Sequence, residues 1–196
     1  MNHAGGGQLP AVTPGTESLG TSVGHFDRAV DEALEHLRGH AVPDRLFTLA
    51  STLGDFSVVW HIVNVGRGLT SRRRFHQVPL LAAGLAVESL VVNQGLKRAV
   101  KRPRPTLEGD PRYEVRRPST SSFPSGHASA AGFTATVLTG WDGARSAPLW
   151  WTIGTVVATS RAYVRIHHAS DVVAGLAVGA TIGLGARAVL RRFGRA

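Results

Sequence analysis

The sequence predicts an all-α fold: an integral membrane helical bundle of about five transmembrane helices, with an amphipathic helix on its N-terminal side. Two observations support this prediction. Apolar runs long enough to cross a bilayer fill the middle and the C-terminal part of the chain, and a stretch before them repeats its apolar residues at helical spacing. The mean hydropathy is near zero because polar segments offset these runs.

Three regions follow from this pattern. Residues 1–23 are rich in Gly, Pro, Thr and Ser and contain no apolar run, so we expect a disordered tail that is not a secretory signal. Residues 24–45 form the expected amphipathic helix, with Phe26 and Val30 on its apolar side. It lies either along the bilayer interface or against the rest of the same protein. Residues 46–196 form the expected membrane domain.

Five segments of the membrane domain are candidate spans, since a helix needs about twenty residues to cross the hydrocarbon core. One of them carries a single charge, Glu88, and another is short but rich in small residues that allow close helix packing. Near the start of the expected span 146–163, Trp150 and Trp151 suit the belt of aromatic residues at a membrane interface. The expected spans are 46–66, 78–96, 127–141, 146–163 and 172–190.

The number of spans predicts which segments share a side of the membrane. Five spans place residues 98–126 and 164–171 on the same side as the N-terminal tail, with residues 67–74 and the C-terminal tail on the other. The two sides carry similar numbers of basic residues, but several on the first side are expected to bind an anion. The positive-inside rule therefore makes the second side cytoplasmic and the first side external.

The charge balance narrows the possible partners. The chain has 22 Lys and Arg residues against 13 Asp and Glu residues, an excess that suits nucleic acid, an anionic membrane surface or an anionic substrate. The basic residues cluster at 67–74, 98–117 and 187–195, each beside an apolar stretch, and no nucleic-acid-binding motif accompanies them. We therefore expect no nucleic-acid partner. The absence of cysteine excludes thiolate catalysis and cysteine zinc sites.

Three short motifs lie beside the expected spans, all on one side of the membrane. The first is Lys97 with Arg104-Pro105, the second is Pro124-Ser125-Gly126-His127, and the third is Ser160-Arg161 followed by His167 and Asp171. Taken singly, each has an ordinary structural explanation, such as an interface anchor or a helix cap. Their combination next to apolar spans favours a shared site.

The side chains of these motifs match the needs of phosphoryl transfer, which asks mainly for positioning and charge compensation. Lys97, Arg104 and Arg161 supply three cations, and arginine offers a planar fork suited to phosphate. Ser125 and Gly126 precede a helix, so their backbone N–H groups can converge on an anion. The sequence therefore predicts an anion-binding cradle.

Turnover also needs a nucleophile and an acid. Asp171 lies four residues after His167, within reach of its Nδ1–H, which would leave Nε2 free to attack phosphorus. His127, on a different helix, can protonate the departing oxygen and later activate water. Two histidines with separate roles suit a two-step displacement without a metal ion.

In order and spacing, these motifs resemble the signature of the type 2 phosphatidic acid phosphatase superfamily: Lys-x6-Arg-Pro, Pro-Ser-Gly-His and Ser-Arg-x5-His-x3-Asp. No defining position departs from it, and the similarity extends over residues 46–190. The resemblance implies an all-α catalytic domain that needs no metal and no other cofactor. It also implies a general acid, His127, a nucleophile, His167, and its partner, Asp171. The phosphate-binding residues that it implies are Lys97, Arg104, Ser125, Gly126 and Arg161.

The resemblance leaves several functions open. Soluble acid phosphatases, vanadium haloperoxidases and a catalytically silent phosphate-binding membrane protein could all carry such motifs. The apolar spans and the short chain disfavour the first two, and retention of both histidines and the aspartate disfavours the third. We therefore expect a lipid phosphate phosphatase of the bacterial plasma membrane that works through a phosphohistidine. Its candidate substrates are polyprenyl mono- or diphosphates, phosphoribosylated polyprenyl carriers, phosphatidylglycerophosphate and phosphatidic acid, with a polyprenyl-linked substrate favoured.

Overall fold

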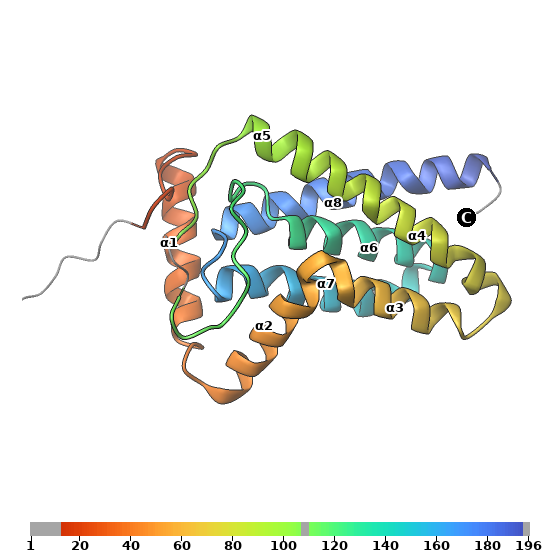
Figure 1. Cartoon of the computed structure of the whole chain (residues 1–196), viewed down its shortest axis with the longest axis horizontal. Coiled ribbons are helices and arrows are strands. Elements are labelled where there is room, and N and C mark those ends of the chain that lie inside the picture. The colour runs from red at the N-terminus through yellow and green to blue at the C-terminus, as the bar shows by residue number, and fades with distance from the viewer. Residues whose placement is uncertain (1–12, 107–109, 194–196) are drawn as a thin grey trace, which may run out of the picture.

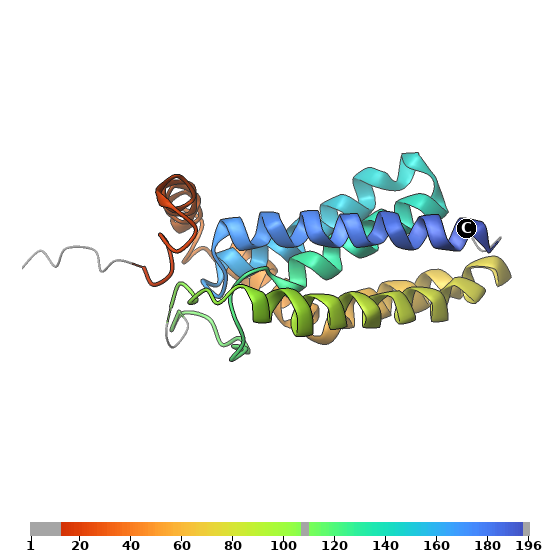
Figure 2. The same cartoon turned by 90° about the horizontal axis from the view of Figure 1, so that it is seen from above.

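The computed structural model describes residues 13–106 and 110–193 and confirms the all-α prediction, because every regular element within these residues is helical. Long helices run side by side, and α1 (Thr21–Glu35) lies across one end of them (Figures 1 and 2). The other elements in chain order are α2 (Ala41–Gly54), η1 (Asp55–Ser57), α3 (Val58–Gly68), α4 (Arg72–Leu90), η2 (Val91–Leu96), α5 (Lys97–Ala99), α6 (Gly126–Asp142), η3 (Ala144–Ser146), α7 (Ala147–Tyr163) and α8 (Ala169–Arg192).

The first long segment is bent. Phe56 and Ser57, between α2 and α3, have φ values of 51° and 59°, a left-handed conformation that residues with a side chain seldom adopt. The sequence predicts one helix over residues 46–66, but the structure divides this segment into α2 and α3 at Phe56 and Ser57. The bend brings the C-terminal end of α2 close to the start of α6, where His127 contacts the backbone carbonyl of Ser51.

The second long segment is continuous from α4 through η2 to α5. It starts at Ser71, whose hydroxyl accepts a hydrogen bond from the N–H of Arg74, as expected of an N-cap serine. η2, which lies between α4 and α5, is π-helical. Such a local widening of a helix is frequent at functional sites. This stretch ends directly before Lys97.

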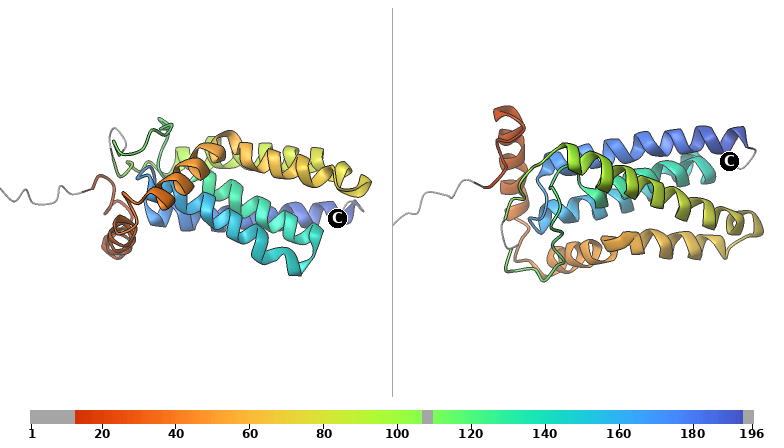
Figure 3. Two further views of the ribbon diagram at one scale, coloured as in Figure 1. Left: turned by 90° about the horizontal axis from the view of Figure 1, so that it is seen from below. Right: turned by 45° about the horizontal axis from the view of Figure 1, so that its top comes forward.

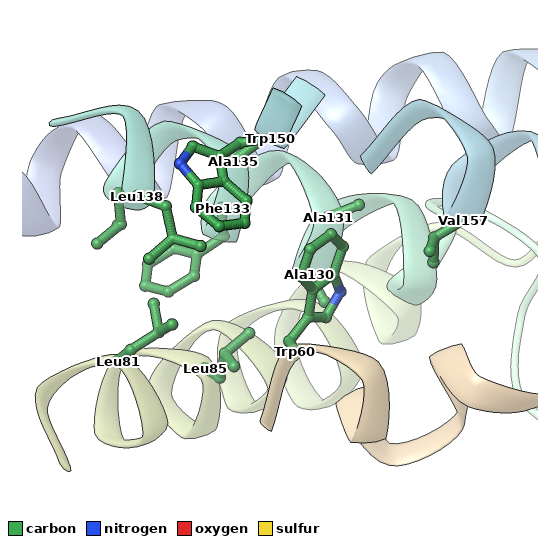
Figure 4. Packing of buried hydrophobic residues seen from close by; sticks show 11 residues of the cluster. Trp60, Leu81, Leu85, Ala130, Ala131, Phe133, Ala135, Leu138, Trp150 and Val157 are labelled. Atoms are coloured by element: carbon green, nitrogen blue, oxygen red, sulfur yellow. The ribbon is translucent and has the colours of Figure 1, made fainter. Parts of the chain in front are cut away.

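The core of the bundle surrounds α6, whose residues from Ala128 to Leu138 are all buried. α8 packs against it with glycines at every fourth position, Gly175, Gly179 and Gly183. A side chain at Gly179 would collide with the backbone of Ser129, so glycine is what allows these two helices to approach closely. The apolar cluster on the other side of α6 includes Trp60, Leu81, Leu85 and Phe133 (Figure 4).

The chain is an integral membrane protein. Within the described residues, the helical segments Ala41–Gly68, Arg72–Ala99 and Ala169–Arg192 are long and apolar enough to cross a bilayer. α6 and α7 have 17 residues each, about 26 Å at the α-helical rise, which falls slightly short of the hydrocarbon core of ~30 Å. That these two helices also cross, which would make five spans, stays a prediction.

The N-terminal region differs from the sequence-based expectation. Residues 1–12 of the expected disordered tail lie outside the described residues, but residues 13–20 form turns, and α1 already begins at Thr21. Arg102 donates a hydrogen bond to the carbonyl of Gly15, and Thr16 is buried. The composition of this segment could not reveal such distant partners. The amphipathic helix expected over residues 24–45 ends at Glu35, and residues 41–45 belong to α2.

Candidate active site

The three sequence motifs meet at one end of the bundle, the end that α1 crosses (Figure 3). Each predicted residue lies at a helix end or in an adjoining loop. Lys97 opens α5 and Arg104 follows in the next loop, while Ser125 is the N-cap of α6. Arg161 is in the last turn of α7, His167 is in the short connection to α8, and Asp171 is in the first turn of α8. Lys97, Arg104, Ser125, Arg161, His167 and Asp171 are all buried.

Backbone contacts hold these ends together. The N–H of His167 donates to the carbonyl of Arg161 at 3.0 Å, which closes the turn after α7. The N–H of Ser125 donates to the carbonyl of Asp171 at 3.0 Å and so joins the starts of α6 and α8. A side-chain carbon at Gly126 would lie 3.6 Å from Lys97 Nζ, so the second span also reaches this point. Residues far apart in the sequence therefore line one region.

His167 has the geometry expected of a nucleophile. Its Nε2 lies 3.2 Å from Arg104 Nη1, and its Nδ1 lies 3.6 Å from Asp171 Oδ2. Because a guanidinium can only donate, the Arg104 contact requires a lone pair on Nε2 and places the proton of the neutral ring on Nδ1. Burial lowers the pKa of His167 well below its ordinary value, and the Asp171 contact only partly opposes this. The ring is therefore neutral near pH 7, with Nε2 unprotonated.

The hydrogen bonds of Asp171 go beyond the expected pair with His167. Its Oδ2 accepts from the hydroxyl of Ser122 and from the N–H of His168, while its Oδ1 accepts from Arg102 Nη1 at 2.6 Å. Ser122 Oγ also lies 3.4 Å from His167 Nδ1. Ser122 thus lies within reach of both the imidazole and the carboxylate. The distance from Ser122 Oγ to His167 Nδ1 is shorter than the 3.6 Å between Asp171 Oδ2 and the same nitrogen.

Arg102 links the site to α1. Its Nη2 donates to Asp27 Oδ2 at 2.6 Å, and both side chains are buried. Asp27 in turn accepts hydrogen bonds from the backbone N–H of Ser170 at 2.7 Å and from its hydroxyl at 2.9 Å. A buried guanidinium that bonds to two carboxylates has its charge compensated and several of its donors satisfied. α1 is therefore bonded to the same arginine that holds Asp171.

His127 lies on another side of this region with partners of its own. Its Nε2 is 3.1 Å from the carbonyl of Ser51 and 3.3 Å from Asp55 Oδ1. Arg161 Nη1 donates to the hydroxyl of the same Ser51. The bend after α2 therefore supplies contacts to both His127 and Arg161.

Several donors around the site have no acceptor. Among the described residues, Arg161 Nε, Arg161 Nη2 and Arg104 Nε are buried and lack a hydrogen-bond partner. An unpaired buried charge of this kind is costly unless a bound anion completes it. Burial also lowers the pKa of Arg104 to about 10, helped by the nearby charge of Arg117 and opposed by Asp171. Both arginines stay charged near pH 7, so the region can bind a phosphate group.

At the start of α6, the backbone N–H of Ser125 is not free to bind an anion, contrary to the prediction from the sequence. The N–H of Ser125 is used in the bond to Asp171, and its hydroxyl accepts from Ala128 N to cap the helix. The N–H groups of Gly126 and His127 belong to the first turn, where a helix offers no internal acceptor. These two, with the positive end of the helix, are the donors that an anion would meet.

The residues that support the predicted ones gave no functional signal in the linear sequence: Ser51, Asp55, Ser122, Arg102 and Asp27. Asp55 was visible only as a polar interruption in an apolar run. Arg102 was one of several arginines near the first motif, and nothing in the linear sequence distinguished it from them. His168 is the N-cap residue of α8, which fits the ordinary structural explanation of its place beside His167.

Comparison with known proteins identifies the family of the chain. The family model described as the PAP2 superfamily matches residues 78–195. The decaprenylphosphoryl-5-phosphoribose phosphatase of Mycobacterium tuberculosis, in strains CDC 1551 / Oshkosh and ATCC 25618 / H37Rv, is 32% identical over 133 residues, which are 68% of this chain and 72% of the relative.

A solved structure shares the fold. It is the crystal structure of a transmembrane PAP2-type phosphatidylglycerolphosphate phosphatase from Bacillus subtilis, which covers 90% of both chains with a TM-score of 0.68 and 20% sequence identity. The fold, the family model and the curated relative agree, and on this evidence the chain belongs to the PAP2 superfamily.

Proposed function

We propose that the protein is a phosphatase that hydrolyses a membrane lipid phosphate, through a phosphohistidine formed on His167. One observation carries this proposal: the unprotonated Nε2 of a buried neutral imidazole lies 3.2 Å from Arg104, which itself has a buried N–H without an acceptor. A nucleophile next to an incomplete anion site is what phosphoryl transfer requires. Family membership and the phosphatase relative support the same reaction class.

In the first step, His167 Nε2 attacks phosphorus and forms an N–P bond while the bond to the lipid oxygen breaks. His127 donates its proton to that departing oxygen. Asp171, with Ser122, holds Nδ1–H and stabilises the positive charge that the ring acquires. Lys97, Arg104 and Arg161 compensate the charge on the phosphoryl oxygens.

In the second step, His127 takes a proton from water, and the resulting nucleophile attacks phosphorus and breaks the N–P bond. Inorganic phosphate leaves, and His167 returns to its neutral form. Asp55 and the Ser51 carbonyl contact Nε2 of His127 and so fix the orientation of the ring through both steps.

We favour a polyprenyl-linked phosphate as the substrate, because the curated relative is named for a decaprenylphosphoryl-5-phosphoribose. We place the protein in the bacterial plasma membrane, and the positive-inside rule favours the extracytoplasmic side for the site. Phosphatidylglycerophosphate and phosphatidic acid are the alternatives.

The decisive experiment is phosphate release by the purified protein in detergent, measured on a panel of polyprenyl phosphates, phosphatidylglycerophosphate, phosphatidic acid and a soluble chromogenic phosphate. We expect turnover of the lipids and its loss by at least 1000-fold in His167→Ala, because removing the nucleophile ends the pathway. His168→Ala is the matched control and should retain far more activity. Turnover by His167→Ala close to wild type would refute the mechanism.

The same assay tests the role of the cations. Since Lys and Arg side chains supply the charge compensation, activity should survive a chelator, whereas vanadate should inhibit by occupying the phosphate site. A loss of activity in chelator that only a divalent ion restores would contradict the proposed metal-independent reaction.

A further inference from the structure

A large basic cleft opens beside the proposed phosphate site. It has a volume of about 880 Å³, and among the described residues its lining includes six Lys and Arg side chains and no Asp or Glu. The basic side chains of this cleft are Lys97, Arg98, Lys101, Arg102, Arg104 and Arg117. A cavity with such a uniform charge attracts anions, because like charges gathered along a shared wall repel one another until a counter-charge arrives.

Three of these six cations have assignments already. Lys97 and Arg104 belong to the proposed phosphate site, and Arg102 is neutralised by Asp27 and Asp171. The other three, Arg98, Lys101 and Arg117, are exposed and have no acidic partner among the described residues. The cleft therefore holds more positive charge than one phosphate group needs.

Hydrogen bonds join the two chain segments that line the basic cleft, so the backbone that carries Lys101 and Arg117 lies beside the proposed phosphate site. Arg104 Nη2 donates to the carbonyl of Thr120 at 3.1 Å, and the backbone N–H of Arg102 donates to Ser121 Oγ at 3.0 Å. Ser121 Oγ donates to the carbonyl of Val100 at 2.6 Å. These bonds tie the segment that follows Arg117 to the segment between Lys97 and Arg104.

The position of Arg117 relative to Arg104 supports the same conclusion. Arg117 is close enough to lower the pKa of Arg104, so the two charges act on one region. The lining also includes polar side chains of Asn93, Gln94 and Ser119, which can donate hydrogen bonds to an anion.

We propose that the basic cleft binds a second phosphate group of the substrate, so that the protein prefers lipids with two phosphate groups to lipids with one. This inference rests on the proposed function and extends it to the substrate class. The second group is either the next phosphate of a diphosphate or a phosphate further along the same head group. Both present the same chemistry to Arg98, Lys101 and Arg117.

The test compares kcat/KM for a polyprenyl monophosphate with kcat/KM for two probes of the same chain length, a polyprenyl diphosphate and a phosphoribosyl polyprenyl phosphate with a 5-phosphate. The variants are Arg98→Gln, Lys101→Gln, Arg117→Gln and their combination. We expect the ratio of two-phosphate to one-phosphate kcat/KM to fall at least tenfold in the combined variant, about 1.4 kcal/mol. Added salt should lower the wild-type ratio in the same direction.

Arg72→Gln with Arg191→Gln is the matched control, because these exposed arginines lie outside the cleft at the far end of the bundle. It should leave the ratio at the wild-type value. Equal losses for all three lipids in the cleft variant, or no change at all, would overturn the inference. If the wild-type protein hydrolyses none of the lipids, the proposed function itself fails.

A neighbouring anionic lipid could supply the same phosphate chemistry. The assay is therefore run in neutral detergent and again with anionic phospholipid added. If the cleft binds bulk lipid, the added phospholipid will change turnover of all three probes together and the variants will abolish that change, which counts against the inference. A preference already present in neutral detergent supports it.

Discussion

Ser122 lies within hydrogen-bonding reach of both members of the proposed nucleophile pair. Its hydroxyl donates to Asp171 Oδ2 and lies 3.4 Å from His167 Nδ1, whereas the imidazole and the carboxylate are themselves 3.6 Å apart. A hydrogen bond to the carboxylate fixes the oxygen that must face the ring. Ser122 is therefore a positioning residue rather than one that touches phosphorus.

For Ser122→Ala we expect kcat to fall about tenfold to a hundredfold with KM nearly unchanged, since the ring loses orientation while the phosphate ligands remain. Steady-state kinetics on a lipid phosphate separate the two constants. Ser122→Thr keeps the hydroxyl and should recover part of the loss. Glu114→Ala, an exposed position in the same loop outside the lining of the basic cleft, is the control. A rise in KM alone would assign Ser122 to substrate binding instead.

If His167 is the nucleophile, as proposed, its protonation will set the acidic limit of activity. Burial lowers its pKa well below the ordinary value of 6.5, and only the neutral ring can attack. As the pH falls, the nucleophile is lost only after the pH passes this lowered pKa. We therefore expect the imidazole to stay neutral at pH 6.5 and to protonate only in more acidic solution.

The measurement is an NMR titration of ring-labelled histidine, assigned with His167→Ala, because the second ionisation of a phosphate substrate near pH 6 would obscure a kinetic profile. A protonated His167 at pH 7 would contradict both the burial argument and the nucleophile assignment.

The residues in the three motifs could be predicted from the sequence, because their chemistry and spacing are local. Their supporting partners could not. Asp27 lies 75 positions from Arg102, and Ser122 lies 49 from Asp171, so their pairing depends on how the helices pack. The role of Ser125 was also incompletely predicted, since its N–H turned out to join α6 to α8.

At the scale of elements, α1 is fastened over the catalytic end by charge as well as by packing. Asp27 bonds to Arg102 and to Ser170 at the start of α8. At its other end, Glu35 and Asp31 pair with Arg165 at 2.9 and 3.0 Å. Hydrogen bonds from Arg112 and Arg38, together with the charge of Arg165, outweigh burial and lower the pKa of Glu35 to about 2, so this carboxylate is charged at neutral pH.

For Asp27→Asn we expect kcat to fall about tenfold, because Arg102 would then keep one carboxylate, Asp171, and draw it away from His167. We also expect a loss of stability of about 3 kcal/mol, the usual effect of removing one partner from a buried ion pair. Thermal unfolding in detergent and the split between kcat and KM measure the two effects. Asp27→Glu should restore part of the activity.

Arg28→Gln is the neighbouring control, since Arg28 is partly exposed and its contacts, 3.6 Å to Glu17 and 3.2 Å to His25 Nδ1, are with N-terminal side chains rather than with Arg102. Wild-type kcat in a stable Asp27→Asn protein would show that α1 and the catalytic carboxylate are independent.

Element types were easier to predict than their limits. The amphipathic pattern identified α1, but its end at Glu35 and the turn before Ala41 carried no strong signal. The left-handed residues Phe56 and Ser57 could not be foreseen, because neither is a residue type that favours positive φ. That bend matters for function, since it brings Ser51 to His127 and Arg161.

At the scale of the whole molecule, the two ends of the bundle differ in chemistry. α1 crosses the end of the bundle where α5 ends and α8 begins (Figure 1). The proposed site and the basic cleft are built from residues at this end. At the other end, Arg67 forms a two-pronged ion pair with Asp142, with both distances 2.7 Å, and joins the α3–α4 turn to the end of α6. If α6 crosses the bilayer, these two ends face opposite compartments.

The absence of cysteine from the chain allows a direct test of this arrangement. Glu114→Cys and Ala144→Cys are exposed positions that flank α6 on its two sides. We expect a membrane-impermeant thiol reagent to label Glu114→Cys in intact cells, and to label Ala144→Cys only after the membrane is opened. α6 can cross because it is enclosed by its neighbours, so its 17 residues need not match the full thickness of the lipid. The outward position of Glu114 follows from the positive-inside rule. Arg165→Cys, beyond α7, should behave like Glu114→Cys. Labelling of Glu114→Cys and Ala144→Cys from the same side would show that α6 does not cross, and reversed labelling would place the catalytic end in the cytoplasm.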